Sequence, residues 1–324
     1  MKIQPPATPE TPMRIRLLQN CITPAHFASL IPGFEALDFR ENPRPNCREF
    51  QVFEHVHQQR LHRESDLLGA LSTRFQAKSR MDGHDVRRWI AGQPGQDVYV
   101  VNPLPQLSYA NFNSNVRSAI IHRLPDFSNC CQRVLDKAGV PLEYEHIGRQ
   151  HNGNYGLCSF WVGSPRFWDK LVSDLIAPVI KLSRSELGCE LHDFLHRPLP
   201  YYGSSTHRPG GLPFLLERAT NMFIQAEFAQ SSVFYRHTRQ EVLDCCVFPF
   251  ERDCVQQFGD AVDAWDAEGR YDTRAMAYFD NAARHSGHGW LAYMDSHSID
   301  FDHGDPRPDL PWFRSDLSPV SPDR

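Results

Sequence analysis

A glutamate near the start of a helix is the residue that the sequence places best for general-base chemistry. The segment PFLLERATNMF (213–223) has apolar residues at helical spacing, and Glu217 and Asn221 lie four residues apart on one face. The helix follows a loop (198–213) rich in glycine and proline. A carboxylate beside such a loop can deprotonate a substrate hydroxyl under a mobile cover. The alternative is a solvated pair of Glu217 with Arg218, stabilised by the helix N-terminus.

The stretch DVYVVNPLPQ (97–106) predicts a short buried strand that ends in a polar, proline-stiffened corner. Asp97 opens this strand, and Asn102 and Pro103 follow its end. Ligands of open α/β sheets bind outside the carboxyl ends of the strands, so Asn102 is expected to contact a ligand. The alternative is an ordinary Asn-Pro turn.

The same corner offers no pair of carboxylates that could hold a cation against a diphosphate. An Asp-Phe-Asp sequence occurs at 300–302, but it lies in a tail rich in proline and aspartate and reads as an acidic patch. The sequence therefore leaves two cofactor interpretations open. Either no metal is used, or a divalent cation (Mn²⁺ or Mg²⁺) is held by residues that the sequence does not identify.

Two further segments contain side chains suited to a sugar or a phosphate. Trp161 lies among other aromatic residues in GLCSFWVGSPRFWDK (156–170), where a flat ring could stack on a sugar, with core packing as the alternative. Ser72 and Arg74, together with Lys78, could neutralise a diphosphate, with a solvated surface as the alternative.

The 16 histidines are scattered and form no tight ligand motif. His192 and His196 lie four residues apart, and with His207 they could hold zinc in a hydrolase. The segment HDFLH (192–196) has no glutamate to serve as a general base, and the RPLP that follows ends the helix, so this hypothesis ranks last. The chain has no GxSxG, P-loop or GxGxxG motif, which argues against serine hydrolases, P-loop NTPases and dinucleotide enzymes.

The composition of the chain indicates a globular protein and argues against nucleic-acid binding, membrane insertion and secretion. The 324 residues are 41% hydrophobic, enough for a large core, and a net charge of −5 without a basic stripe argues against nucleic acid as a partner. No run is apolar enough to span a membrane, and the N-terminus lacks the apolar core of a signal peptide. Nine cysteines without a CxxC pattern indicate a reducing compartment, so a cytoplasmic location is expected. The oligomeric state stays open.

Strands alternating with helices predict an α/β fold. Strands are expected at 14–18, 97–101 and 157–163, and helices at 50–62, 82–92, 128–139, 165–180, 213–228, 259–268 and 273–284. Residues 82–92 carry the clearest helix signals, since Asp82 and Asp85 suit the N-terminus and Gly92 the C-terminus. Pro178 predicts a kink in the helix at 165–180.

Five ordered blocks over residues 31–228 resemble an uncharacterised bacterial family of polysaccharide loci. The blocks are IPGFEALDFRENPRPNCREF, LLGALSTRFQAKSRMDGHDVRRWI, DVYVVNPLPQ, CSFWVGSPRFWDKL and PFLLERATNMFI. The last two blocks also resemble nucleotide-sugar glycosyltransferases of the GT-A kind. The resemblance implies a GT-A-like, Rossmann-type mixed sheet flanked by helices, and a transferase that moves a sugar from a nucleotide-sugar donor to a glycan acceptor in polysaccharide biosynthesis.

The resemblance also implies roles for residues and boundaries for domains. Glu217 would be the base or an acceptor contact beside Arg218; the other expected substrate contacts are Asp97, Asn102 and Pro103 at the donor corner and Ser72 and Arg74 near the phosphates. With a catalytic domain over 13–240, composition along the chain predicts a disordered N-terminus (1–12), a helical C-terminal extension (241–297) and a Pro/Asp-rich tail (298–324). The chain departs from the family pattern at Leu67-Leu68, Lys78-Ser79-Arg80 and Ser159-Phe160-Trp161, so an inactive carbohydrate-binding or assembly module of the same fold is the alternative.

Overall fold

A computed structural model describes residues 13–200 and 209–296. The expected disordered N-terminus (1–12), the expected Pro/Asp-rich tail (298–324) with its Asp-Phe-Asp, and His207 all lie outside the described residues. Among the described residues, no helix has both the length and the apolar composition needed to cross a membrane.

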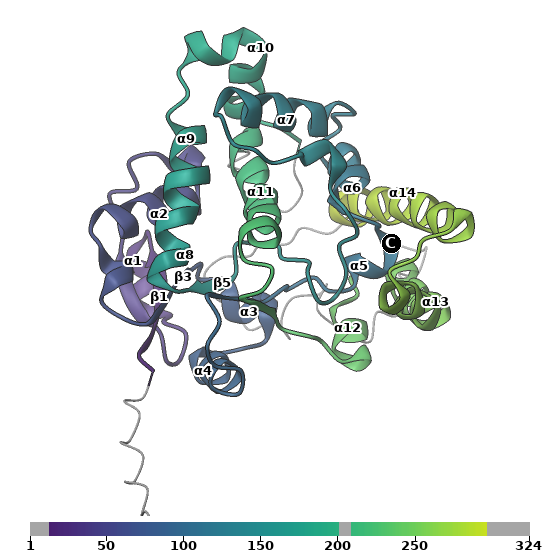
Figure 1. The fold of residues 1–324 in the computed structure, drawn as a ribbon, viewed down its shortest axis with the longest axis horizontal. Coiled ribbons are helices and arrows are strands. Elements are labelled where there is room, and N and C mark those ends of the chain that lie inside the picture. The colour runs from purple at the N-terminus through teal and green to yellow at the C-terminus, as the bar shows by residue number, and fades with distance from the viewer. Residues whose placement is uncertain (1–12, 201–208, 297–324) are drawn as a thin grey trace, which may run out of the picture.

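One mixed sheet of six strands organises the fold, as the sequence predicted for an α/β protein (Figure 1). Across the sheet the order is β2-β1-β3-β5-β4-β6. Strands β1, β2 and β3 are parallel to one another, β5 runs antiparallel to both β3 and β4, and β6 is parallel to β4. The bounds of the strands are β1 (Ile15–Cys21), β2 (Glu35–Asp38), β3 (Leu67–Leu71), β4 (Val98–Val100), β5 (Trp161–Gly163) and β6 (Ser232–Phe234).

Helices cover both faces of the sheet, so its strands are buried on both sides. Along β4, Val98 and Val100 join one hydrophobic cluster while Tyr99 and Val101 join another, as the two-residue repeat of a strand requires. The first cluster includes α2 (Glu49–Gln58), α7 (Phe127–Lys137), α8 (Pro165–Lys170), α10 (Arg184–His196) and α11 (Gly211–Glu227). The second packs against α3 (Phe75–Ser79) and α4 (Gly83–Ala91), which lies on the opposite side of the sheet in Figure 1.

The helix expected at 165–180 forms as three consecutive pieces. After α8, the turns of η4 (Leu171–Ile176) widen into a π-helix, and α9 (Ala177–Ile180) completes the segment. Pro178 has no N–H to donate to the preceding turn, so the wide turn lies where the sequence predicted a kink. Short helical segments connect the other elements: α1 (Pro24–Ala28), η1 (Pro45–Cys47), η2 (Leu61–Arg63) and η3 (Tyr144–His146).

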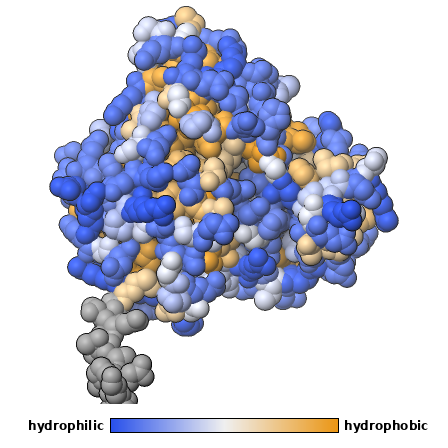
Figure 2. All heavy atoms as spheres, in the orientation of Figure 1, coloured by the Kyte–Doolittle hydropathy of each residue, from blue (hydrophilic) through white to orange (hydrophobic). Residues whose placement is uncertain are grey.

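The last of the described residues form α12 (Arg239–Cys245), α13 (Pro249–Glu268) and α14 (Thr273–Ser296). Helices α13 and α14 pack on α5 (Leu107–Ala110) and α6 (Ser114–Ile121), two helices that the sequence did not predict, and α12 packs on α13. The Tyr278 hydroxyl donates to the Tyr109 carbonyl (2.8 Å), and Arg149 forms a bidentate pair with Asp266. Polar residues cover most of the face shown in Figure 2, and apolar residues show through in the upper and middle parts of this face.

Candidate functional site

Polar residues gather at the edge of the sheet where β1, β3 and β4 end. Because β5 runs antiparallel to β3 and β4, its first residue lies at this same edge, and Val100 pairs with Trp161 there. Ser72 directly follows β3, Asn102 lies two residues beyond β4, and Ser159 lies two residues before β5. This is the edge at which ligands of open α/β sheets bind.

Glu217 reaches this edge from α11. Its Oε2 accepts the backbone N–H of Cys158 (2.9 Å), and its side chain keeps 20% of its surface exposed. Four residues further along the helix, Asn221 accepts the N–H of Gly156 (2.8 Å). Gln225 continues the stripe by donating to the Asn154 carbonyl (3.0 Å). One face of α11 therefore fixes the loop that leads into β5, and Glu217 is the member of this stripe closest to β5.

A second carboxylate, which the sequence analysis missed, faces Glu217. Glu49 is the first residue of α2, and the two carboxylates repel each other. Burial raises the pKa of Glu49 above its usual value, and the Glu217 charge adds to this, while its own backbone N–H, Arg48 and Ser159 lower it. The only sequence signal for Glu49 was its place near the end of the block IPGFEALDFRENPRPNCREF, to which no role was assigned.

The loop between the two carboxylates has an unusual backbone. Cys158 and Ser159 both adopt left-handed conformations, with φ of 63° and 54°. Two consecutive non-glycine residues in this region are strained, and such strain is concentrated at functional sites. The Lys78 ammonium lies 3.4 Å from the Cys158 sulfur. Burial nevertheless raises the pKa of the Cys158 thiol, which argues against a thiolate nucleophile.

The structure does not bring Asp97 to this edge. Asp97 precedes β4, whereas Asn102 follows it, so the two residues lie at opposite ends of one strand. Its Oδ1 accepts from the Ser164 hydroxyl (2.6 Å), and its Oδ2 pairs with Arg166 (2.5 Å). Asp97 thus helps to fix the start of α8, and the interpretation that it shares a donor corner with Asn102 needs correction.

Asn102 and Pro103 lie where the sequence predicted. The Asn102 Oδ1 accepts the Leu104 N–H (3.0 Å), which closes a tight turn through Pro103. The Nδ2 of the same side chain is buried without a hydrogen-bond partner in the described structure. Buried polar atoms of this kind are uncommon, so Asn102 retains a donor for a ligand while it shapes the turn.

Ser72 and Arg74 lie on the loop directly after β3, and Lys78 lies in α3, the helix that follows. The Ser72 hydroxyl accepts the Arg74 N–H (3.3 Å), and Arg74 is the residue that precedes α3. This loop and α3 therefore bring Arg74 and Lys78 to the edge that also holds Asn102 and Ser159.

Trp161 and Arg218 are buried, which changes the roles that the sequence suggested. The Trp161 ring is 2% exposed and packs on Phe53 and Trp168, with ring centroids 5.0 and 4.7 Å apart. A ring with no exposed face cannot stack on a sugar, so Trp161 is part of the core. The Arg218 guanidinium donates to the Phe214 carbonyl (2.9 Å) inside the protein and lies only 4.0 Å from Glu217 Oε1.

Two groups of histidines remain as candidate metal ligands. The rings of His192 and His196 are 4.6 Å apart on α10, but among the described residues no third ligand completes a site there. Within the described ranges, one cluster has three ligand atoms close together: His57, His62 and Asp169. It lies near the opposite edge of the sheet, before β3 and after β5.

Comparisons with protein-family models, with curated proteins and with solved structures find no match for this chain. The functional interpretation therefore depends on the residues themselves and on the motif resemblance.

Proposed function

We propose that this protein transfers a sugar from a nucleotide-sugar donor to a glycan-type acceptor, at the sheet edge that holds Glu49 and Glu217. The observation that carries the proposal is the Glu217 carboxylate, which the Cys158 N–H holds beside Lys78 and the strained turn at Cys158 and Ser159, with the charge of Glu49 nearby. Glycosyl transfer needs a base for the acceptor hydroxyl and positive charge for the departing diphosphate.

Glu217 is the candidate base. The N–H of Cys158 holds one of its oxygens and so orients the carboxylate, while a carboxylate has lone pairs for further donors. The partial exposure of its side chain gives an acceptor hydroxyl access. Glu49, with its raised pKa, is suited to hold a proton next to it, since a pair of carboxylates with different environments can divide acid and base roles.

The donor would lie along the ends of β3 and β4. Arg74 and Lys78 would face its diphosphate, and Asn102 would offer the amide hydrogens of its buried Nδ2. Lysine and arginine charges can stabilise a leaving diphosphate without a metal, so metal-independent transfer is the form that we propose. Bound Mn²⁺ or Mg²⁺ is the alternative form, and the mixed sheet with helices on both faces is compatible with a GT-A-like fold in either case.

The second candidate is a carbohydrate-binding or assembly module without turnover. One specific observation favours it, because the stripe of Glu217, Asn221 and Gln225 holds the loop before β5 and gives Glu217 a structural reason to be there. The two candidates differ in whether the carboxylate is needed for a reaction or only for the loop.

The test is a donor screen with the full-length protein. UDP-, GDP-, CMP- and dTDP-sugars are incubated with it in EDTA or with Mn²⁺, and released nucleotide is measured. The variant Glu217→Gln keeps an oxygen for the Cys158 N–H but cannot act as a base. Glu227→Gln is the matched control, since Glu227 is an exposed residue of the same helix that pairs with Lys170 (2.7 Å).

We expect one donor to release nucleotide, and Glu217→Gln to lower the rate by about 10²–10⁴-fold while Glu227→Gln leaves it unchanged. A small effect of EDTA would support the metal-independent form. No release from any donor, combined with no thermal shift by any nucleotide sugar, would overturn the proposal. A thermal shift without release, equal in both variants, would support the binding module instead.

A further inference from the structure

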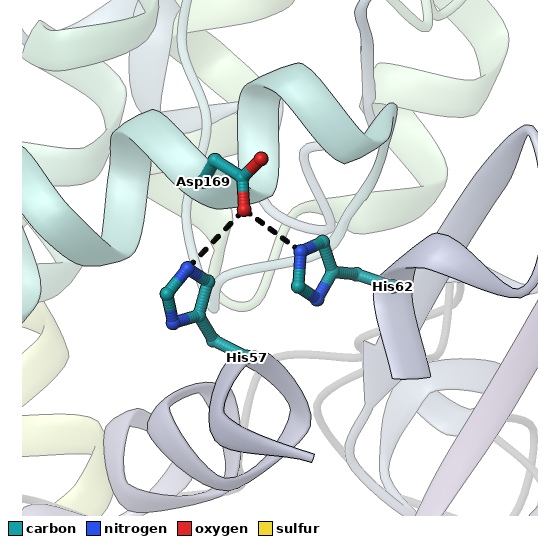
Figure 3. A group of neighbouring side chains, drawn as sticks. All are labelled: His57, His62 and Asp169. Atoms are coloured by element: carbon teal, nitrogen blue, oxygen red, sulfur yellow. Dashed lines mark hydrogen bonds and ion pairs between the residues drawn. The ribbon is translucent and has the colours of Figure 1, made fainter. Parts of the chain in front are cut away.

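Three side chains from three different elements converge at the edge of the sheet opposite the Glu49–Glu217 site (Figure 3). His57 lies in the last turn of α2, His62 in η2 just before β3, and Asp169 in α8 just after β5. Figure 3 shows both imidazole rings pointing toward one carboxylate oxygen. The rings are stacked, with centroids 5.1 Å apart and planes 13° from parallel.

The spacing of the ligand atoms suits a tetrahedral metal ion. Nε2 of His57 and Nε2 of His62 lie 3.3 and 2.9 Å from Oδ1 of Asp169, and all three atoms lie within 4.8 Å of one another. Ligand atoms about 2.0–2.2 Å from zinc stand about 3.3–3.6 Å apart in a tetrahedron. The two nitrogen-to-oxygen distances are within about 0.4 Å of this tetrahedral spacing, so an ion could enter between the three atoms after a small rearrangement of the side chains.

Neighbouring groups orient two of the three ligands. The Nδ1 of His62 faces the Val56 carbonyl at 3.5 Å, which places its Nε2 toward the cluster. The Arg63 guanidinium donates to Oδ2 of Asp169 (2.6 Å), so that Oδ1 is the oxygen facing the histidines. Contacts of this kind to the outer atoms of metal ligands fix the ligand geometry in many metal sites.

The cluster is buried on one side and open on the other. His62 is 1% exposed at its side chain, whereas His57 and Asp169 keep 27% and 36%. His57 also lines a cleft of about 360 Å³, together with Glu54, Val172 and Lys181. A fourth ligand could therefore be a water molecule that approaches from the solvent side.

We propose that His57, His62 and Asp169 bind a divalent transition metal of the zinc class, with water as the fourth ligand. Two imidazole nitrogens and one carboxylate oxygen form a donor set that favours zinc over Mg²⁺ or Ca²⁺, which prefer oxygen ligands. The bound ion would tie α2 and η2 to α8 and so stabilise this edge of the sheet. This inference does not depend on the proposed transferase activity, because the two sites share no residue.

The contrasting explanation is a metal-free network in which Asp169 accepts hydrogen bonds from the two histidines and from Arg63. The two explanations predict different results in a metal titration, because only a metal site binds Zn²⁺ saturably. Full-length protein without a histidine tag is stripped with a chelator, and Zn²⁺ and Mg²⁺ are titrated separately by calorimetry and by thermal unfolding. Co²⁺ replaces Zn²⁺ in a third titration, because its visible absorption reports a tetrahedral site.

The variants are His57→Gln and Asp169→Asn, both at partly exposed side chains. The control is the double variant His192→Gln and His196→Gln, which removes the other close histidine pair. We expect one equivalent of Zn²⁺ to bind and to raise the unfolding temperature by several degrees, since binding to the folded state alone stabilises it. Each cluster variant should weaken Zn²⁺ at least tenfold while its metal-free unfolding temperature stays near that of the wild type. The control variant should bind Zn²⁺ as tightly as the wild type does. Mg²⁺ should not raise the unfolding temperature of the wild type.

Absence of saturable Zn²⁺ binding would overturn the inference. Binding that survives in His57→Gln and Asp169→Asn, or that is lost in the His192 and His196 control, would also overturn it. If a cluster variant unfolds without metal, a Co²⁺ spectrum of the wild type decides: a tetrahedral spectrum that Zn²⁺ displaces supports the site, and an octahedral spectrum contradicts it.

Discussion

The stability of the folded protein should depend on pH through one buried glutamate, Glu251 of α13. Its side chain is 1% exposed; its Oε2 accepts the Val247 N–H (2.9 Å), and its Oε1 accepts from the Trp290 indole. These donors and the nearby Arg117 favour the carboxylate, but burial outweighs them and raises the pKa of Glu251 from 4.5 to about 7.

The sign and size of the effect follow from this shift. The folded state holds the proton more tightly than the unfolded chain, so the stabilisation is complete below pH 4.5 and is lost as the pH rises through about 7. A difference of about 2.5 pKa units corresponds to about 3 kcal/mol of unfolding free energy between these limits. Glu251→Gln removes the ionisation but keeps an oxygen for one of the two donors.

The assay is urea unfolding of the wild type and of Glu251→Gln at several pH values from about 4.5 to about 8. Other titrating groups cancel in the difference between the two proteins. As the pH rises, we expect the unfolding free energy of Glu251→Gln to increase by about 3 kcal/mol relative to that of the wild type. For Glu268→Gln, at an exposed position of the same helix, the difference in unfolding free energy from the wild type should stay constant over this pH range. A constant difference for Glu251→Gln, or a loss with rising pH, would refute the argument that burial dominates over Arg117.

Three further predictions concern the core and the loop before β5. Asn221→Ala removes the acceptor for the Gly156 N–H and the donor to the Asn154 carbonyl. It should lower the free energy of unfolding in urea by about 1–3 kcal/mol. A loss below about 0.5 kcal/mol would contradict the conclusion that Asn221 fixes the loop before β5. Trp161→Ala should cost about 3–5 kcal/mol of unfolding free energy as a core cavity, and a stable variant with weakened sugar binding would contradict its assignment to the core. Burial lowers the pKa of His122 from 6.5 to about 3, so its stabilisation is present above pH 6.5 and is lost toward pH 3. When the pH falls from about 7 to about 4, His122→Phe should therefore lose about 3 kcal/mol less unfolding free energy than the wild type, as measured by urea unfolding. Equal losses in the two proteins would refute this prediction.

Local signals in the sequence predicted the elements that depend on neighbouring residues. The helix at 82–92 forms as α4, with Asp82 and Asp85 in a reciprocal capping box and Gly92 at its end. Apolar runs likewise predicted β4 and most of the segment from α8 to α9. By contrast, α5 and α6 were missed because they are short and are stabilised by packing on α13 and α14, which no local pattern reveals.

The site could be predicted only in part, because it combines residues that are distant in the sequence. Glu217 and Asn102 were found from their places at a helix start and a strand end. Glu49 and Lys78 meet Glu217 and Cys158 only through the fold. Asp97 was correctly placed at the start of its strand, but the resemblance assigned it to the same donor corner as Asn102, which lies beyond the other end of that strand.

If Glu217 acts as a base at the sheet edge that it shares with Glu49, its carboxylate is needed for turnover. The most direct measurement is the rate of nucleotide release from a saturating nucleotide-sugar donor, compared between Glu217→Gln and Glu227→Gln with acceptor present. We expect Glu217→Gln to lower the rate by about 10²–10⁴-fold and Glu227→Gln to retain the wild-type rate. Equal rates in the two variants would contradict this role, because Glu217 would then only hold the loop at Cys158.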